Sequence, residues 1–400
     1  MRYYISLLLC ISAALPSILA APLEPRKASA KAIYLITNED DNAVVGLNVN
    51  RDGSITMGRK TMTGGKGLAG IDAMTNQPAA TDTLFSQSAI RVEGNTLLAV
   101  NSGSNTISMF RISARDPTKL QMVGQPADTM GDFPVSVAFS RKNKIACAAN
   151  TGARAGLACF KVGKAGLTPI SSQMTLTFPL GQSTPPKGPT NTVSHVLLNA
   201  DQSAFLTTVK GDPMANKTGF ISVLPIDGAQ KTVAATDTRS TPNGTAVLFG
   251  SIALPGTDNI LATDAAFGAT TLSIDPQTGK ATSLNKATVD GQKATCWATF
   301  SQSTETAFVT DVGVNRLVEV DPTSGDLLQT TDVPNSNPGM VDLVSAGNMV
   351  YALAPGNGST PASVAVMRTG KRGEPVTLVQ TADLTVAGAG VRSQGMTIMT

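Results

Sequence analysis

The sequence is poor in the residue types that most binding chemistries require. Its 400 residues include one histidine, four cysteines and only 4% aromatic residues. So few histidines and cysteines exclude a zinc site of the ordinary kind, and we expect no metal, although a calcium or magnesium site made only of carboxylates stays open. Charged residues make up 15% with a formal net of +3, and no basic cluster is interleaved with aromatics. This composition argues against nucleic acid as a partner.

Long hydrophobic runs are also absent beyond the N-terminus. The apolar run over residues 5–19 follows Arg2, ends in small residues near Ala20, and is too short to span a bilayer. It predicts a secretory signal peptide at 1–20 rather than a buried helix, because a proline-rich stretch follows at once. A leader or linker would occupy 21–31, before a single domain at 32–400. We therefore expect a secreted monomer, extracellular or associated with the cell wall, with no membrane span.

Secretion into an oxidising compartment would allow the cysteines to form a disulfide and the three Asn-X-Ser/Thr sequences to carry glycans. Cys147 and Cys159 are placed almost symmetrically about a turn, so they predict a disulfide across a hairpin, with two small buried thiols as the alternative. Cys296 would remain unpaired, and a role as nucleophile would require the only histidine to lie beside it. The sequence also predicts glycosylation at the turn-rich acceptor sites, which are Asn216, Asn243 and Asn357.

The sequence does contain a repeat. A short apolar strand that often ends in Asn or Asp recurs seven times, spaced by roughly 43 to 64 residues, and most copies lead through a turn into another strand. The copies begin at Ala32, Thr96, Lys144, Ser203, Asn259, Thr306 and Met349. This spacing is typical of propeller blades and is too long for solenoid coils.

The repeats predict an all-β fold, a seven-bladed β-propeller with four-stranded antiparallel blades. The terminal strands should close the ring, because an open ring would expose two sheet edges. We expect the segment 376–386 to pair near the N-terminal blade. A two-sheet sandwich is the alternative, but it does not explain seven equivalent phrases.

Residues that differ at equivalent positions of the innermost strands are the candidate site. We expect each innermost strand to begin at the mouth of the channel. The positions are Ser136, His195, Ser251, Trp297 and Val341, with Asp342 one step on. His195 could serve as general acid or base or be a hydrogen-bonded structural histidine, and Trp297 could line or plug the channel. Asp264 and Asp311, on the facing turns, could join the pocket or cap the turns.

Three sequence segments resemble those of the lactonase-type seven-bladed propellers, a family that includes 6-phosphogluconolactonase and fungal carboxy-cis,cis-muconate cyclase. They start at Asn101 (NSGSNTISMFRI), Ser194 (SHVLLNADQSAFLTTVKGD) and Thr304 (TETAFVTDVGVNRLVEVDPTSGDL). The chain is most similar to the secreted fungal branch called 3-carboxymuconate cyclase-like. The resemblance implies a catalytic histidine, arginines and a glutamate. Only His195 matches, Asp264 replaces the glutamate, and the arginine is missing.

Two classes of function follow from these observations. As an enzyme, the protein would be a cyclase or lactone hydrolase without a cofactor, acting on a small carboxylate or lactone. His195 would move a proton, Asp264 or Asp342 would orient the imidazole, and Ser136, Ser251, Trp297 and Asp311 would contact the substrate. As a non-catalytic protein, it would be an adhesin or antigen that binds extracellular matrix or a host surface. A quinone-dependent redox enzyme is a third possibility, but it lacks the basic residues that such a cofactor needs.

Overall fold

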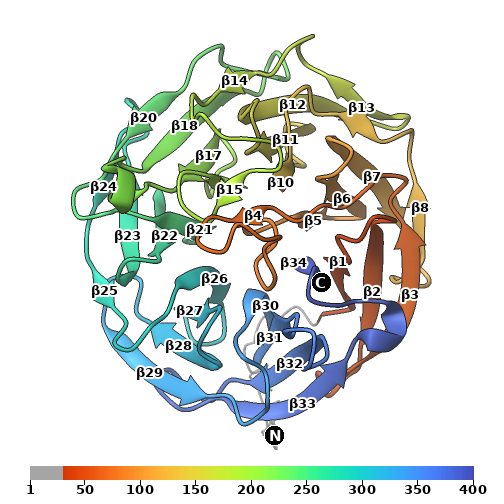
Figure 1. The fold of residues 1–400 in the computed structure, drawn as a ribbon, viewed down its shortest axis with the longest axis vertical. Helices are drawn as coiled ribbons and strands as arrows, with labels where there is room; N and C mark the ends of the chain where they lie inside the picture. Colours follow the sequence, from red (N-terminus) through yellow and green to blue (C-terminus); the bar gives the residue numbers. More distant parts are fainter. Residues whose placement is uncertain (1–29) are drawn as a thin grey trace, which may run out of the picture.

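The computed structural model describes residues 30–400, which form a ring of seven four-stranded antiparallel sheets (Figure 1). The predicted seven-bladed propeller is therefore confirmed, and no two-sheet sandwich forms. The predicted signal peptide and most of the predicted leader lie outside the described residues. Helical structure in the described part is limited to the 3-10 turns η1 (Pro213–Ala215) and η2 (Thr385–Ala387), and no helix there could cross a membrane.

Each blade is read from the channel outward. The innermost strands, starting with the blade at the N-terminus, are β34 (Gln394–Met399), β5 (Ile90–Glu93), β10 (Pro134–Ser140), β16 (Val193–Leu198), β21 (Leu248–Ala253), β26 (Thr295–Ser301) and β30 (Val341–Ala346). The second strands are β1 (Ala32–Ile36), β6 (Thr96–Asn101), β11 (Ile145–Asn150), β17 (Ala204–Val209), β22 (Asn259–Asp264), β27 (Thr306–Asp311) and β31 (Met349–Ala354). The second strands coincide with the seven repeats found in the sequence.

The outer half of each blade varies more. The third strands are β2 (Ala43–Val49), β7 (Thr106–Ile112), β12 (Gly156–Gly163), β18 (Phe220–Asp227), β23 (Gly268–Ile274), β28 (Arg316–Val320) and β32 (Ser363–Arg368). The outermost strands are β3 (Ile55–Met62), β8 (Leu120–Met122), β13 (Gly166–Pro169), β19 (Thr232–Val233), β24 (Ala281–Ser283), β29 (Leu327–Asp332) and β33 (Thr377–Asp383). Four blades add a short strand beside the third, namely β9 (Ala127–Asp128), β14 (Leu176–Thr177), β20 (Thr238–Ser240) and β25 (Ala287–Thr288).

The middle strands are apolar because both of their faces are covered by neighbouring blades. Every residue of β31 is buried, and so is every residue of β11. The outermost strands have solvent on one side, and β33 accordingly alternates between exposed and half-buried residues. The repeats were visible in the sequence because this radial change in burial recurs in every blade.

The ring is closed by the C-terminal strand. β34 pairs with β1 in antiparallel register, with Tyr34 opposite Thr397, and becomes the innermost strand of the first blade. The expectation that 376–386 pairs with the N-terminal blade was wrong in its main point, because β33 is the outermost strand of the last blade. A side-chain link does exist there, since the Gln380 amide donates to and accepts from the backbone of Ile55 at 2.9 and 2.8 Å.

The third blade contains the predicted disulfide. Cys147 on β11 and Cys159 on β12 stand opposite each other and are bonded, while Cys296 is a buried free thiol. A bridge between residues 12 apart closes a short loop of the unfolded chain, which stabilises the fold by restricting the unfolded state.

Replacing both Cys147 and Cys159 with alanine should therefore lower the free energy of unfolding by about 3 kcal/mol. The measurement is urea denaturation of the variant and the wild type under non-reducing conditions. A difference below about 0.5 kcal/mol would show that the bridge adds nothing beyond the packing of the two strands.

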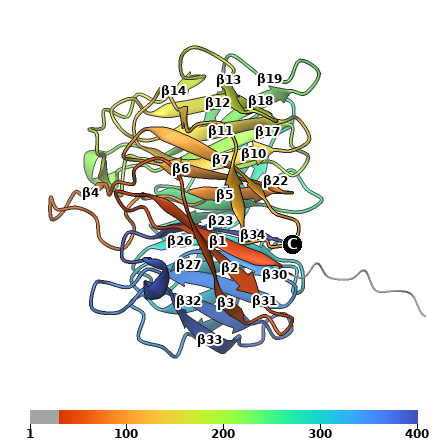
Figure 2. The ribbon, with the colours of Figure 1, turned by 90° about the vertical axis from the view of Figure 1, so that its right-hand side faces the viewer.

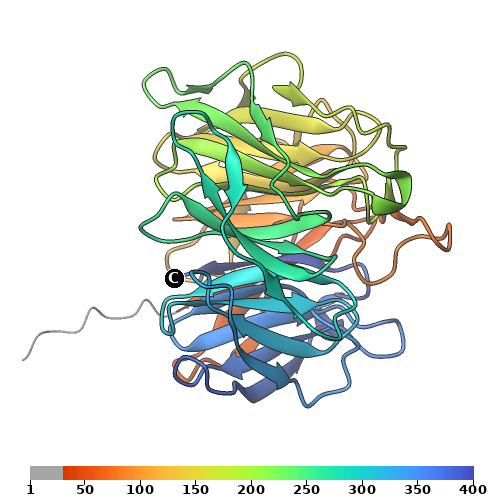
Figure 3. The same cartoon turned by 90° about the vertical axis from the view of Figure 1, so that its left-hand side faces the viewer.

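The propeller has two unlike faces (Figures 2 and 3). On one, which we call the open face, the innermost strands end, and the C-terminus lies there. On the other, the closed face, long connections cross between blades. The segment 63–89 lies across this face, where β4 (Ile71–Asp72) pairs in parallel with β15 (Lys187–Gly188).

Candidate functional site

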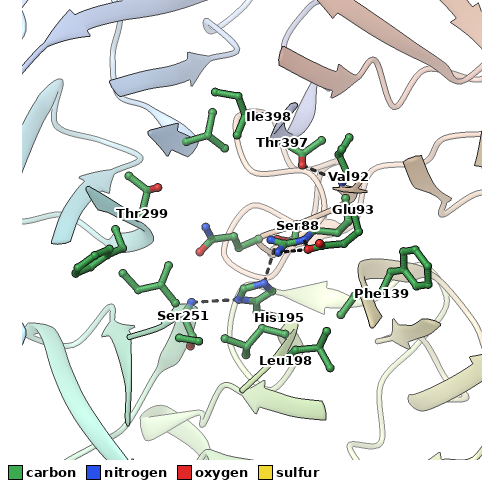
Figure 4. A pocket seen from close by; sticks show the side chains of 18 of the residues that line it. Ser88, Val92, Glu93, Phe139, His195, Leu198, Ser251, Thr299, Thr397 and Ile398 are labelled. Carbon is green, nitrogen blue, oxygen red and sulfur yellow. Dashed lines mark hydrogen bonds and ion pairs between the residues drawn. The ribbon is translucent and has the colours of Figure 1, made fainter. Parts of the chain in front are cut away.

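A cavity of about 680 Å³ occupies the channel, and residues from the innermost strands of all seven blades line it (Figure 4). Its outer wall is formed by the ends of these strands and by Thr400, so the cavity opens on the open face. Arg91, Glu93 and Arg141 are the charged residues of its lining, and Gln87, Ser88 and His195 lie deeper. A volume of this size suits a small molecule.

The other end of the channel is closed by residues 82–88, which we call the plug segment. Buried side chains of the blades hold its backbone carbonyls: Lys210 Nζ donates to Phe85 O at 2.6 Å, and Trp297 Nε1 donates to Ser86 O at 3.0 Å. Phe85 and Ser88 adopt φ values of 56° and 63°, in the left-handed region, which bend the segment into the channel. The expected mouth where the innermost strands begin is therefore wrong, because the plug segment fills that end.

Asp342 binds the plug segment to two blades. Its carboxylate accepts hydrogen bonds from the backbone N–H of Ser88 at 3.2 Å and of Met396 at 2.9 Å, and it also accepts from the Gln87 amide at 3.3 Å. Burial raises the pKa of Asp342 to about 6 in spite of these donors. These contacts indicate a structural role at the floor of the cavity rather than the catalytic role that the sequence suggested.

His195 lies between Ser88 and Ser251 (Figure 4) and is 4% exposed. Its Nδ1 accepts the backbone N–H of Ser251 at 3.1 Å, and its Nε2 lies 3.0 Å from Ser88 Oγ. Because a backbone N–H can only donate, Nδ1 carries no proton, so the neutral ring has its proton on Nε2 and donates it to Ser88. Burial, helped by the positive charge of Arg91, lowers the pKa of His195 to about 3.

His195 shares one task with Ser136, at the same register position of its blade, and with Asp342, one position earlier in register. Ser136 Oγ accepts the backbone N–H of Val196 at 3.0 Å, just as Asp342 accepts that of Met396. In all three cases, the side chain of one innermost strand binds the backbone of the innermost strand of the next blade. Ser136, His195 and Asp342, which differ in residue type, therefore each join adjacent blades. This is a packing function that comparison of the repeats did not suggest.

The remaining predicted site residues are divided between floor and turns. Ser251 lines the cavity beside His195, and Trp297 is fully buried against Phe249 below the plug segment. Asp264 and Asp311 each accept three backbone N–H groups of nearby turns and are not part of the cavity lining. They cap turns, which is the structural role that their register allowed.

Arginines do reach the cavity, although not from the repeat positions at which the resemblance places them. Arg91 lies at the rim in an ion pair of 2.6 Å with Glu93. Arg141 packs its guanidinium beside Gly94 and, within residues 30–400, forms no ion pair. Arg154, Arg316 and Arg368 are engaged elsewhere, by Asp132, Asp290 O and Asp52 O. Arg141, Gln87 and Ser88 could not be found from the sequence, because none of them repeats or belongs to a motif.

Two further titratable groups lie at the plug segment: Asp82 is its first residue, and Lys210 is bonded to it. Burial lowers the pKa of Lys210 and raises that of the partly buried Asp82, and the charge of each opposes the shift of the other. Burial also raises the pKa of the Cys296 thiol well above its usual range, so this cysteine is not a reactive thiolate. No group of three or more His, Cys, Asp or Glu side chains within residues 30–400 is placed to hold a metal ion.

The fold and the central cavity together define a seven-bladed propeller with room for a small ligand. No protein-family model matches the sequence, and the search of curated proteins finds no match. Among solved structures, the periplasmic gluconolactonase PpgL of Pseudomonas aeruginosa is similar, with a TM-score of 0.65 and 14% identity over 93% of this chain and 99% of that one.

Two other solved structures show the same likeness. A protein from Lactobacillus plantarum has a TM-score of 0.61 and 14% identity over 93% of this chain and 100% of that one. A putative 6-phosphogluconolactonase from Bacteroides uniformis has a TM-score of 0.56 and 16% identity over 72% and 82%. At these identities the comparisons establish a shared lactonase-like propeller fold.

Proposed function

We propose that this protein is a lactonase-type propeller that binds a small lactone, or the corresponding hydroxy acid, in the central cavity and opens or closes the ring there. The observation that carries the proposal is the cavity itself, with a neutral His195–Ser88 pair at its floor and two guanidinium groups at its rim. The fold shared with PpgL supports the same class of substrate. Secretion and glycosylation are proposed along with it, on the sequence features alone.

The hydrogen bonds at the floor suggest what each residue does. His195 Nε2–H donates to Ser88 Oγ, so the Ser88 hydroxyl keeps its own proton for a ligand oxygen. A lactone carbonyl bound there would be polarised by the Ser88 hydroxyl, and water would attack the carbonyl carbon. Neither nitrogen of His195 has a free lone pair in this arrangement, so we assign His195 a positioning role and leave proton transfer to water.

A non-catalytic binding protein is the second candidate, and the hydrogen bonding of His195 favours it. Both ring nitrogens of the only histidine are engaged by the protein itself. In that case the cavity would hold its ligand without turnover, and the partner could be an extracellular or host-surface molecule.

The test compares Ser88→Gly with the wild type. Glycine suits the positive φ at this position, so the variant removes the hydroxyl without backbone strain. With glucono-1,5-lactone as the probe, we expect kcat/KM to fall at least about a hundredfold, as expected for the loss of a hydrogen-bond donor to the reacting carbonyl oxygen. Ser172→Ala, at an exposed position outside the cavity, is the control.

The possible results separate the two candidates. Turnover that depends on Ser88 supports the enzyme. Gluconate or lactone binding in a calorimeter without turnover supports the binding protein. No turnover and no binding would overturn a lactone site in this cavity.

A further inference from the structure

Positive charge is concentrated in two adjacent blades. Residues 90–166, which contain the second and third blades, include ten Lys and Arg against four Asp and Glu, a net of +6 from ten minus four. The whole chain has a net of only +3, so the rest of the molecule is slightly acidic. The asymmetry is invisible in the overall composition.

The topology brings this charge to the open face. Arg115 and Lys119 lie in the turn between β7 and β8, and Lys164 lies in the turn between β12 and β13. The turn between β10 and β11 supplies Arg141, Lys142 and Lys144. All six side chains are exposed, and we call them the basic sector.

Little in the surroundings neutralises the basic sector. Asp116, in the same turn as Arg115, is already paired with Arg59 at 2.9 Å. Lys142 Nζ donates to the backbone carbonyl of Asp201 at 3.1 Å, and although its charge helps to lower the pKa of the Asp201 carboxyl, the two side chains form no ion pair. Within the described residues, none of the six forms an ion pair. The sector is also continuous with the cavity, because Arg141 belongs to both.

The lack of exposed hydrophobic and aromatic residues in the basic sector indicates which class of polyanion would bind there. Among residues 30–400, the strongly exposed large hydrophobic residues are all outside residues 90–166, so the sector offers no side chain to insert into a lipid bilayer. None of these exposed hydrophobic residues is aromatic, so the protein surface offers nucleic-acid bases no side chain on which to stack. The basic sector therefore best suits a polyanion that is held by charge alone. Hydroxyl groups of such a polyanion could reach the polar rim of the central cavity.

We propose that the basic sector is a docking surface for an acidic polysaccharide, a chain that carries carboxylate or sulfate groups. The three predicted glycan acceptors are consistent with this use, because Asn216, Asn243 and Asn357 all lie in connections on the closed face. The open face would therefore stay free of the protein's own sugars. This inference does not depend on lactone turnover.

The experiment uses the full chain without its signal peptide and measures affinity for polygalacturonate and for heparin, which separate carboxylate from sulfate recognition. The double variant Lys119→Glu, Lys164→Glu should weaken binding about tenfold at low salt, and binding should fall steeply as salt rises. The matched control is Lys231→Glu, Lys280→Glu, in the equivalent turns of the next two blades, with the same change in net charge. It should change affinity less than about twofold.

The outcomes are distinct. Equal losses in both double variants would show an effect of net charge alone and overturn the docking surface. Equal affinity for duplex DNA, or binding to phosphatidylserine vesicles but not to either polysaccharide, would overturn the assignment of the partner. Dextran, a neutral polysaccharide, should not bind. Turnover of glucono-1,5-lactone should be the same in all variants, so this test fails or succeeds separately from the proposed function.

Discussion

Replacing His195 with alanine should lower lactone turnover about a hundredfold and the free energy of unfolding by about 3 kcal/mol. The activity falls because Ser88 loses the donor that orients it, and a displaced group at a reacting centre costs about this much. Stability falls because the Ser251 N–H loses its buried acceptor and a hole remains. The measurements are kcat/KM with glucono-1,5-lactone and urea denaturation.

Two pH profiles distinguish positioning from proton transfer. With its pKa near 3, His195 stays neutral from pH 5 to 8, so it should produce no titration in the activity profile over that range. A limb near pH 6.5 that disappears in His195→Gln would contradict the positioning role and restore the general acid or base that the sequence suggested.

The stability profile has a defined sign. The pKa of His195 is lower in the folded protein than its ordinary value of 6.5, so below pH 6.5 the unfolded chain binds the extra proton and stability is lost as pH falls. By pH 5, wild type should lose about 2 kcal/mol from this group relative to His195→Gln. Comparing the two proteins at each pH cancels Asp342, whose raised pKa acts with the opposite sign in this window.

Removing residues 394–400 should abolish the cooperative fold. The deletion takes away the innermost strand of the first blade, exposes the inner edge of β1, and removes the Met396 N–H from the buried Asp342 carboxylate. These losses are comparable with the total stability of a typical domain, about 5–15 kcal/mol. Thermal unfolding followed by near-ultraviolet circular dichroism should lose its sharp transition.

A synthetic peptide with the sequence of 394–400 should restore the transition by pairing with β1, whereas a scrambled peptide should not. Deletion of Thr400 alone, which lies beyond β34, should leave the melting temperature within a few degrees of wild type. A truncated protein that melts as sharply as the intact chain would show that six blades and an open edge suffice.

The fold could be predicted because the middle strands repeat the same environment seven times. β11 and β31 are buried on both faces, and burial of that kind leaves a short apolar run that is visible in the sequence. The closing strand was misassigned because β34 lacks such a run: its sequence, QGMTIM, resembles a polar edge, and its role depends on a partner more than 350 residues away.

The site was predicted only in part. His195 was placed correctly in the channel, because residues that differ between equivalent positions are a signal that packing does not explain fully. The plug segment was missed, because residues 82–88 have no period or motif and are held by side chains from other blades, such as Lys210 and Trp297. Because the plug segment was not foreseen, the open end of the channel could not be predicted from the sequence.

The sequence by itself determined the number of blades, the strands that make their middles, the disulfide partners and the solitary histidine at the channel. These follow from short-range periodicity and from the composition of each repeat. Only the tertiary structure decided which end of the channel is closed, which arginines reach the cavity, and that His195 is neutral with both nitrogens bonded. The physical reason is that burial and hydrogen-bond partners at the hub come from chain segments far apart in sequence, and those contacts exist only once the ring has closed.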